Sequence, residues 1–406
     1  MAYKIYDLIL RFIFVVLNIP LIHGNKYISW LNGQKNIFSQ IKKHIHKTIW
    51  IHCASMGEYE HIKPLLIHLK KQNPRIILTF FSPSGFENFQ DHNLVYQVSY
   101  LPLDTKNNMI HFIDTINPQM VIVSKNDIWP NMIKCIHNNK IPLFLVGLKL
   151  KQSKIIRWIN RQFYINHFGL FSYIFCQEDI TYNFLNTNNI KTCMQIGDLR
   201  AEQMIKEKSN IIKNQMISSF VKNKPTIIYG SLETNDYDII IDFIKKRKDV
   251  NHIVVPHELK NSKMNDFVNK LQEEYFYYSK TSYKNIPKKN ILIIDTFGLL
   301  KHAYRYSLIT YVGGGFDQGV HNTVEPAIYG NQIIFGPKHK DFSETFLFIE
   351  KEIAQVVNNK NQFEILINKY LDNRNNNNLD KLSLFIKNNS QVSSIVVNKI
   401  NEMIKF

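Results

Sequence analysis

The sequence has few cysteines, no long uninterrupted apolar run and fewer acidic than basic side chains. Its four cysteines are scattered through 406 residues and form no CxxC pair. This argues against a disulfide scaffold and a zinc site, and it favours a reducing compartment. The apolar segment Leu8–Ile22 is shorter than the roughly 20 residues that a spanning helix needs. No small-residue cleavage site follows it, which argues against a cleaved signal peptide.

Two interpretations of this N-terminal segment stay open. It forms a helix buried against the core, or it is a one-sided membrane anchor. Basic residues lie near it, among them Lys4, Arg11 and Lys26, and they would favour an anionic membrane surface. We therefore expect residues 1–24 to form a membrane-associating segment.

The net charge of +17 comes from 50 Lys and Arg against 33 Asp and Glu. Nucleic acid, an anionic membrane or a phosphorylated substrate could each explain the excess. The chain is also rich in Lys, Asn and Ile, so compositional drift is an alternative. With 45% hydrophobic residues, the composition is that of a globular protein.

Short β-branched runs alternate with amphipathic stretches along most of the chain, which predicts parallel strands joined by crossover helices. The fold class is therefore α/β, with two doubly wound sheets. Expected strands in the first half are 48–52, 76–81, 95–100, 120–123, 142–146 and 173–176, and those in the second are 226–229, 253–255, 291–294, 308–312 and 332–335. The expected domains are 25–205 and 224–382, with a linker at 206–223 and a C-terminal helix, 383–406, that packs back on the first domain.

The most distinctive stretch is GGGFDQGVHNTVEP, which follows the predicted strand ending at Val312. Glycines allow positive φ and close backbone approach. Asn322 is suited to cap a helix, and Glu325 stands at the third position after it. Amides at such a helix start could bind an anion, or Glu325 could hold two ribose hydroxyls. A plain capping box after a glycine turn is the structural alternative.

Other polar or glycine-containing loops follow predicted strands of both halves. In open α/β sheets, ligands bind at such strand ends, where the strand order reverses. Glu58 follows the strand at 48–52 and would also complement a helix dipole. Asp198 and Arg200 could simply pair with each other. The remaining strand-end residues are Ser84, Gly85, Asp127, Gly230, Ser231, Pro256, His257, Phe297, Gly298 and Leu299.

Together the motifs ASMGEYE, IWPN, GDLR, VPHE, DTFG and GGGFDQGVHNTVEP resemble the Kdo (3-deoxy-D-manno-octulosonic acid) transferases of lipopolysaccharide assembly. The resemblance implies a GT-B architecture, with two Rossmann-like domains facing a cleft. It also implies transfer of Kdo from CMP-Kdo to the lipid A precursor (lipid IVA), with inversion at the anomeric carbon and no metal. The implied location is the cytoplasmic face of the bacterial inner membrane.

The resemblance also implies roles for individual residues. Glu58 matches the general base, while Asp127 and Arg200 match residues that stabilise the transition state. The matching CMP-binding residues are Pro256, His257, Phe297, Gly298, Leu299, Asn322, Thr323, Val324 and Glu325, and further substrate contacts are expected at Ser84, Gly85, Lys149, Gly230 and Ser231.

Two positions depart from the family pattern. Asp127 stands where the family has a glutamate, one methylene longer. After the strand at 142–146 the family usually has an arginine, and here only Lys149 or Lys151 is available. Lysine lacks the fork that binds a sugar carboxylate with two hydrogen bonds.

Three other functions stay open. A GT-B enzyme that uses a UDP-sugar and a different membrane acceptor would keep the fold. A nucleic-acid-binding protein would need aromatic residues interleaved with Lys and Arg, and no such stripe is evident. An inactive, membrane-binding homologue would fit the substituted positions.

Overall fold

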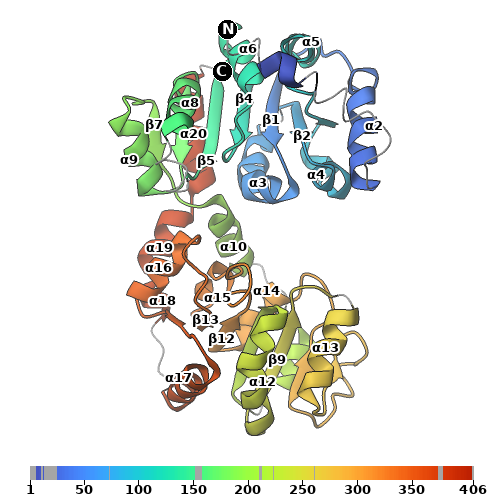
Figure 1. The fold of residues 1–406 in the computed structure, drawn as a ribbon, viewed down its shortest axis with the longest axis vertical. Coiled ribbons are helices and arrows are strands. Elements are labelled where there is room, and N and C mark those ends of the chain that lie inside the picture. Colours follow the sequence, from blue (N-terminus) through green and yellow to red (C-terminus); the bar gives the residue numbers. More distant parts are fainter. Residues whose placement is uncertain are drawn as a thin grey trace. The chain divides into compact units, whose positions relative to one another are not determined.

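The computed structural model describes residues 6–10, 12, 25–72, 74–150, 158–209, 213–222, 224–259, 261–373 and 378–404. These residues belong to two compact units, one formed by 1–203 with 388–406 and the other by 204–387. Each unit contains one seven-stranded sheet (Figure 1). All the described strand pairings are parallel, as the alternating sequence pattern predicts.

In the first unit the strand order is β3-β2-β1-β4-β5-β6-β7. The chain therefore reverses its direction across the sheet between β1 and β4, where loops at the carboxyl ends of the strands diverge and leave room for a ligand. The strands are β1 (Thr48–Cys53), β2 (Ile76–Phe80), β3 (Gln97–Tyr100), β4 (Pro118–Ser124), β5 (Leu143–Leu148), β6 (Tyr173–Cys176) and β7 (Cys193–Gln195).

Alternating strand residues build two apolar layers in this unit, because successive side chains point to opposite faces of a sheet. Trp50 and Val121 pack on one face, and Ile51 and Ile122 on the other. The first face is covered by α2 (Asn25–Gln40), α5 (Lys106–Ile116), α6 (Pro130–Asn138), α8 (Trp158–Phe168) and α9 (Asp179–Thr187). The second is covered by α3 (Met56–Lys70), the start of α10 (Leu199–Ser209) and α20 (Val392–Met403), while α4 (Pro83–Asn88) follows β2.

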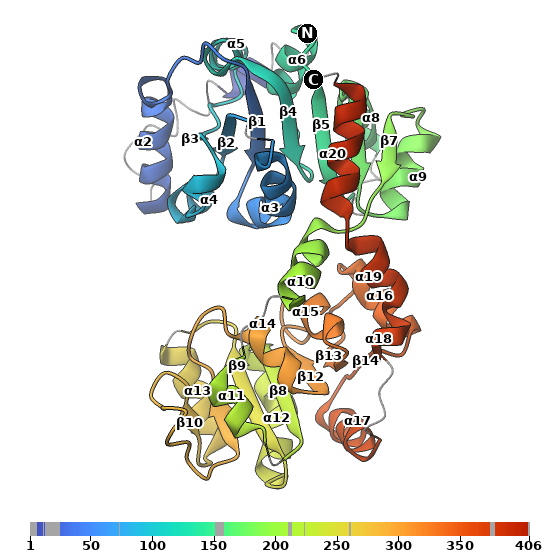
Figure 2. The same cartoon turned by 180° about the vertical axis from the view of Figure 1, so that it is seen from behind.

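The end of the chain returns to the first unit. In Figure 2, α20 is drawn in red among the blue and green elements of that unit. Its buried residues Val392, Val396 and Ile400 belong to the same apolar cluster as Leu65 of α3. Burial of these side chains joins the C-terminal helix to the unit that carries Glu58.

The second unit repeats the plan, with the order β10-β11-β9-β8-β12-β13-β14 and a reversal between β8 and β12. Its strands are β8 (Thr226–Leu232), β9 (Asn251–Pro256), β10 (Phe276–Tyr277), β11 (Ile291–Ile293), β12 (Ile309–Val312), β13 (Gln332–Phe335) and β14 (Ala354–Val356). Its helices are α11 (Gln215–Phe220), α12 (Tyr237–Lys246), α13 (Asn261–Leu271), α14 (Leu300–Ala303), α15 (Val324–Ile328), α16 (Ser343–Glu350), α17 (Lys360–Asp372), α18 (Asn378–Lys381) and α19 (Ser383–Asn389).

The predicted doubly wound α/β fold is confirmed in both units, although three short strands were not predicted. These are β7, β10 and β14, each of two or three residues. Within the predicted linker, 206–223, α10 continues to Ser209, and α11 packs Met216, Ile217 and Phe220 into the core of the second unit.

Most of the predicted membrane-associating segment, 1–24, lies outside the described residues. In the part that is described, Tyr6 donates a hydrogen bond to Asp104 at 3.1 Å, and Asp7 accepts one from the backbone N–H of Lys106 at 2.8 Å. Leu8 and Phe12 are both 68% exposed. None of the helices built from described residues has the length and apolar character needed to cross a bilayer.

Candidate active site

Glu58 lies at the strand-order reversal of the first sheet, in the first turn of α3 after β1. Its Oε2 accepts a hydrogen bond from the backbone N–H of Ala54 at 2.5 Å. Its carbonyl oxygen accepts a hydrogen bond from the hydroxyl of Ser124, at the end of β4. Burial, and then the negative charge of Asp127, raise the pKa of Glu58. The carboxylate is therefore held in place, and its proton affinity is raised in the direction that suits a general base.

Asp127 follows β4 and is fixed by two side chains. Its Oδ2 accepts hydrogen bonds from Nε2 of His52 at 2.7 Å and from the indole N–H of Trp129 at 2.8 Å. His52 is fully buried, and its Nδ1 lies 2.8 Å from the hydroxyl of Thr79, which accepts a hydrogen bond from Trp50. Every donor and acceptor in this hydrogen-bond network has a partner when Nε2 of His52 carries the proton.

Arg200 and Asp198 follow β7, and they interact through the backbone. The Arg200 N–H donates to Oδ1 of Asp198 at 2.8 Å, and Gln177 donates to Oδ2 at 2.8 Å. The Arg200 guanidinium makes no hydrogen bond or ion pair with any residue that the structure describes. Lys149, after β5, pairs with Glu178 at 2.5 Å. Lys151, its sequence alternative, lies outside the described residues.

Ser84 and Gly85 lie in α4, after β2. The hydroxyl groups of Ser82 and Ser84 are 2.8 Å apart. A Cβ added at Gly85 would lie 2.3 Å from the Phe80 ring, so this glycine permits close packing. The two positions thus have a clear structural role, and their substrate contacts stay predictions.

In the second unit, the three glycines follow β12, at the strand-order reversal. Gly314 has φ +86°, and a Cβ at Gly315 would lie 2.5 Å from the backbone nitrogen of Gly336. Asp236 is fully buried and holds this loop by accepting hydrogen bonds from the Gly314 N–H at 2.8 Å and the Tyr311 hydroxyl at 2.7 Å. The glycines are required by close backbone approach, as the sequence predicted.

After the glycine-rich loop, Asn322 caps the start of α15. Oδ1 of Asn322 accepts hydrogen bonds from the N–H groups of Val324 at 2.9 Å and Glu325 at 3.3 Å. The Asn322 amide donates to Oε1 of Glu325 at 3.2 Å. These two backbone amides already have an acceptor, so the structure favours the capping alternative over an anion site made by them. The half-buried Glu325 borders a small pocket with Lys301, His302 and Tyr329.

His257, after β9, belongs to a cluster with Glu233 and His321. Oε1 of Glu233 lies 3.9 Å from Nε2 of His257 and 3.6 Å from Nε2 of His321. Lys263 pairs with the other Glu233 oxygen at 3.1 Å. Burial, and then the charge of His257, lower the pKa of His321.

Among the described residues, this cluster is the group whose side chains could hold a metal ion. The imidazole rings of His257 and His321 are stacked, however, with centroids 4.0 Å apart and planes inclined by 16°. Each imidazole binds a metal through a lone pair in its ring plane. The two lone pairs therefore do not converge on one point unless a ring rotates.

The remaining predicted positions also follow strands of the second sheet. Phe297 is 81% exposed beyond β11, beside Gly298, which has φ +80°. Such an aromatic face could stack on a nucleobase. Ser231 has φ 54°, at a register shift between β8 and β9, and a Cβ at Gly230 would lie 2.4 Å from the hydroxyl of Tyr304. Pro256 ends β9, Leu299 precedes α14, and Thr323 is buried with its hydroxyl unpaired in the described part of the chain.

Several polar residues around these positions were not predicted from the sequence: His52, His61, Lys125, Glu233, Asp236 and His321. Glu233 follows a predicted strand, so its position was a usable signal. His52 and His61 lie inside regular elements, β1 and α3, where the sequence pattern does not distinguish them from core residues.

Comparisons with known proteins point to one enzyme family. Residues 32–203 match the profile of a family described as 3-deoxy-D-manno-octulosonic-acid transferase (kdotransferase). A 3-deoxy-D-manno-octulosonic acid transferase of Aquifex aeolicus is 30% identical over 312 residues, covering 75% of this chain and 80% of the relative. The enzyme of the same name from Haemophilus influenzae is 27% identical, covering 73% of this chain and 72% of the relative.

Solved structures support the fold alone, because their sequence identities are low. UDP-GlcNAc 2-epimerase from Neisseria meningitidis has a TM-score of 0.60 at 15% identity, covering 88% of this chain and all (100%) of its own. MurG from Acinetobacter baumannii has a TM-score of 0.54 at 10% identity, with the same coverage.

The two doubly wound parallel sheets have the GT-B architecture, and the match to the kdotransferase profile makes the protein a glycosyltransferase. The 30% sequence identity to the Aquifex aeolicus enzyme, over most of both chains, then identifies the family within this class. The chain belongs to the family of Kdo transferases.

Proposed function

We propose that the protein transfers Kdo from CMP-Kdo to the lipid A precursor, with inversion at the anomeric carbon. Glu58 takes the proton from the attacking hydroxyl of the acceptor sugar. The hydroxyl oxygen bonds to the anomeric carbon, while the bond from that carbon to the phosphate oxygen breaks and CMP leaves with the electron pair. A single displacement of this kind inverts the configuration.

The observation that carries this proposal is the state of Glu58. The carboxylate is oriented by the Ala54 N–H, and burial and the Asp127 charge raise its pKa. Its Oε1 makes no hydrogen bond with the described residues, and it is therefore available to a substrate hydroxyl. A general base needs both a fixed position and a pKa nearer to neutral pH than that of a solvated glutamate.

Asp127 and Arg200 are proposed to stabilise the transition state. His52 and Trp129 orient Asp127, and the unpaired guanidinium of Arg200 suits developing negative charge. On the donor side, we propose that CMP binds in the second unit, along the strand-end loops that carry His257, Phe297 and Asn322–Glu325. The exposed ring of Phe297 supports this assignment.

The acceptor is a lipid, so we also propose association with the cytoplasmic face of the inner membrane. The exposed Leu8 and Phe12, together with a net charge of +17, support this location. Apolar side chains enter the interfacial region, and a basic protein is attracted to anionic lipids.

A transfer assay with CMP-Kdo and the tetraacyl lipid A precursor tests the proposal. We expect Glu58→Ala to lose about 10²- to 10⁴-fold in turnover, the usual contribution of a general base. CMP should still raise the melting temperature of this variant, because the CMP site lies in the other unit. The matched control is Glu60→Ala, two residues along the same helix. EDTA should not change the rate, because the displacement uses no metal ion.

Wild-type turnover by Glu58→Ala would contradict the assignment of the base. Stabilisation by UDP in place of CMP would favour the alternative GT-B enzyme that uses a UDP-sugar.

A further inference from the structure

Three basic residues follow strands near Glu58: Lys125, Lys149 and Arg200. The sequence offered Lys149 or Lys151 for the acidic group of the sugar. The Lys149 ammonium is 2.5 Å from Oε1 of Glu178, and Lys151 lies outside the described residues. A lysine neutralised by a neighbouring carboxylate offers little net charge to a substrate. Within the described residues of this group, the positive charge available to an anionic substrate is therefore that of Lys125 and Arg200.

Lys125 is held in an unusual backbone conformation directly after β4. Its φ is 57°, a left-handed value that disfavours residues with a side chain. Its N–H donates to the carbonyl of Val146 at 2.8 Å. Asn126, the next residue, exchanges two hydrogen bonds with the backbone of Lys149, and Ser124 bonds to the carbonyl of Glu58. The loop is thus fixed on both sides of Lys125, and strain retained in this way is common at functional sites.

The Lys125 ammonium has no direct partner in the described part of the chain. The side chain is half-buried, and it makes no hydrogen bond or ion pair with the residues that the structure describes. Burial, and then the positive charge of Arg200, lower its pKa, while Asp198 and Glu58 act in the opposite direction. A partly desolvated cation without a partner is stabilised when an anion binds to it.

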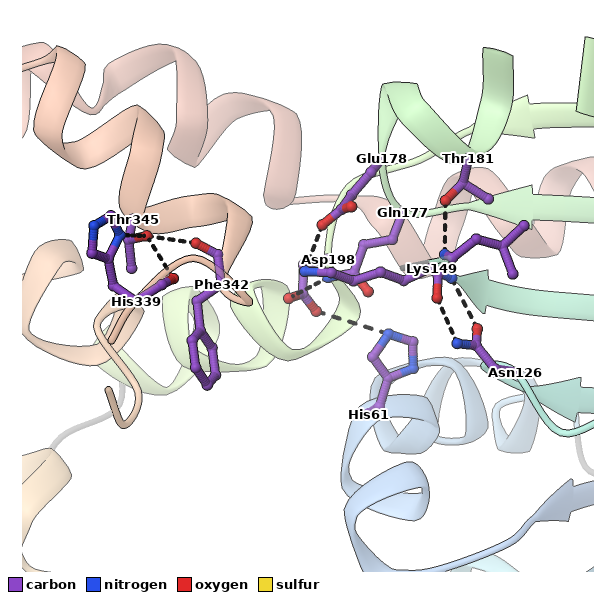
Figure 3. A network of polar contacts seen from close by, with 11 residues as sticks. His61, Asn126, Lys149, Gln177, Glu178, Thr181, Asp198, His339, Phe342 and Thr345 are labelled. Carbon is purple, nitrogen blue, oxygen red and sulfur yellow. Dashed lines mark hydrogen bonds and ion pairs between the residues drawn. The ribbon is translucent and has the colours of Figure 1, made fainter. Parts of the chain in front are cut away.

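A second unpartnered group lies in the same region. His61 of α3 is 1% exposed, and neither ring nitrogen has a hydrogen-bond partner among the described residues. Its Nε2 is 3.9 Å from Oδ1 of Asp198, and Figure 3 shows the ring turned toward Asp198. Gly147 leaves room for the ring, because a Cβ there would lie 2.1 Å from Cε1 of His61. Buried polar groups are normally paired, so this unpaired ring marks a second polar group near Asp198 that is not fully satisfied by the described residues.

We propose that Lys125, together with Arg200, binds the acidic group of a sugar substrate beside Glu58. The group is a carboxylate or a phosphate, since both accept charge-assisted hydrogen bonds from an ammonium and a guanidinium. Lys125 thereby takes the role for which the sequence offered Lys149 or Lys151. This inference rests on the proposed function, because it assumes that one of the two sugars occupies this unit.

Binding measurements test the inference without requiring turnover. Free Kdo supplies a carboxylate and glucosamine 4-phosphate supplies a phosphate, and calorimetry gives the dissociation constant of each. We expect Lys125→Met to weaken one probe about tenfold or more, the effect of losing one charge-assisted hydrogen bond. Lys125→Arg should retain most of the affinity. The probe that loses affinity identifies which substrate contributes the acidic group.

Lys140→Met is the matched control, because Lys140 is exposed and also has a left-handed backbone, with φ 54°. It should bind both probes as the wild type does. Lys125→Gly removes the charge and relieves the backbone strain, so it keeps the test decisive if Lys125→Met folds poorly.

The inference is overturned if the wild type binds neither probe, if Lys125→Met binds both unchanged, or if Lys149→Met alone causes the loss. Lysine-dependent binding of a probe without any transfer from CMP-Kdo would instead contradict the proposed function and leave the anion site standing.

Discussion

Glu58 makes a structural contact that also suits the chemical role proposed for it. One oxygen accepts the Ala54 N–H ahead of α3, as a carboxylate near a helix start commonly does. The helix dipole and this hydrogen bond favour the ionised form, whereas burial and Asp127 favour the protonated form, and the net effect raises the pKa. The position of Glu58 in the first turn of α3 fits the helix-dipole explanation, and its raised pKa fits the proposed role as a base.

The pH dependence of turnover should report this balance. Glu58 must be ionised to accept a proton, so kcat should fall at acidic pH, with a midpoint above that of an ordinary glutamate. Asp127→Asn removes a negative charge that raises the pKa of Glu58, so the midpoint should move to lower pH, apart from any loss in maximal rate. The measurement is a kcat profile from about pH 4 to about pH 8.

The exposed Asp114 of α5 provides the control for this profile. Asp114→Asn should leave the midpoint where it is. A midpoint that does not move in Asp127→Asn would show that the two carboxylates are not coupled in solution.

Sequence and structure differ most clearly at the basic residues. The sequence could place Glu58, because a carboxylate directly after a strand is visible as a pattern. It did not identify Lys125, and it could not show that Lys149 is paired, because this pairing depends on Glu178, which contacts Lys149 from the loop after β6. Pairing over such a distance in the sequence is decided by tertiary structure.

Among the elements, the loop after β12 explains why three glycines occur together. Gly314 needs a positive φ, and Gly315 lies against the backbone of Gly336 at the start of the next loop. Asp236, the residue directly before α12, then fixes the loop through its carboxylate. The loop is therefore packed backbone against backbone, and neither partner can yield as a flexible side chain could.

Gly315→Ala should consequently destabilise the second unit and weaken CMP binding. The added Cβ would lie 2.5 Å from the Gly336 nitrogen, and overpacking of this kind costs about 1–3 kcal/mol. Thermal unfolding and a CMP titration measure the two effects. Gly169→Ala is the control, since its Cβ would have its nearest contact at an ordinary 3.6 Å. Equal melting temperatures for the two variants would contradict this account.

The same contrast between local and tertiary effects explains which strands were predictable. The central strands β1, β4, β8 and β12 are fully or almost fully buried, so they read as apolar runs. The strands β7, β10 and β14 contain only two or three residues. Their pairing is set by their neighbours in the sheet, and their own sequences carry too little pattern to show it.

At the scale of the whole molecule, the described part of the N-terminal segment turns polar side chains toward the protein and apolar side chains toward the solvent. Tyr6 and Asp7 bond to the first unit, while Leu8, Ile9 and Phe12 are exposed. In a helix that packs on its own protein, the apolar side chains would face inward. Exposed apolar residues on a protein of net charge +17 are what the proposed interfacial anchor requires.

Vesicle sedimentation distinguishes these two interpretations. The wild type should sediment with vesicles that contain anionic phosphatidylglycerol, and bind less to purely zwitterionic vesicles or in high salt, because screening weakens the attraction. The double variant Leu8→Asp/Phe12→Asp should lose most of this binding and still be stabilised by CMP. Ile365→Asp is the matched control, since Ile365 of α17 is also an exposed apolar residue, at 71%. If both variants bind vesicles as the wild type does, residues 8 and 12 do not form the anchor, and the basic charge alone would have to account for any membrane association.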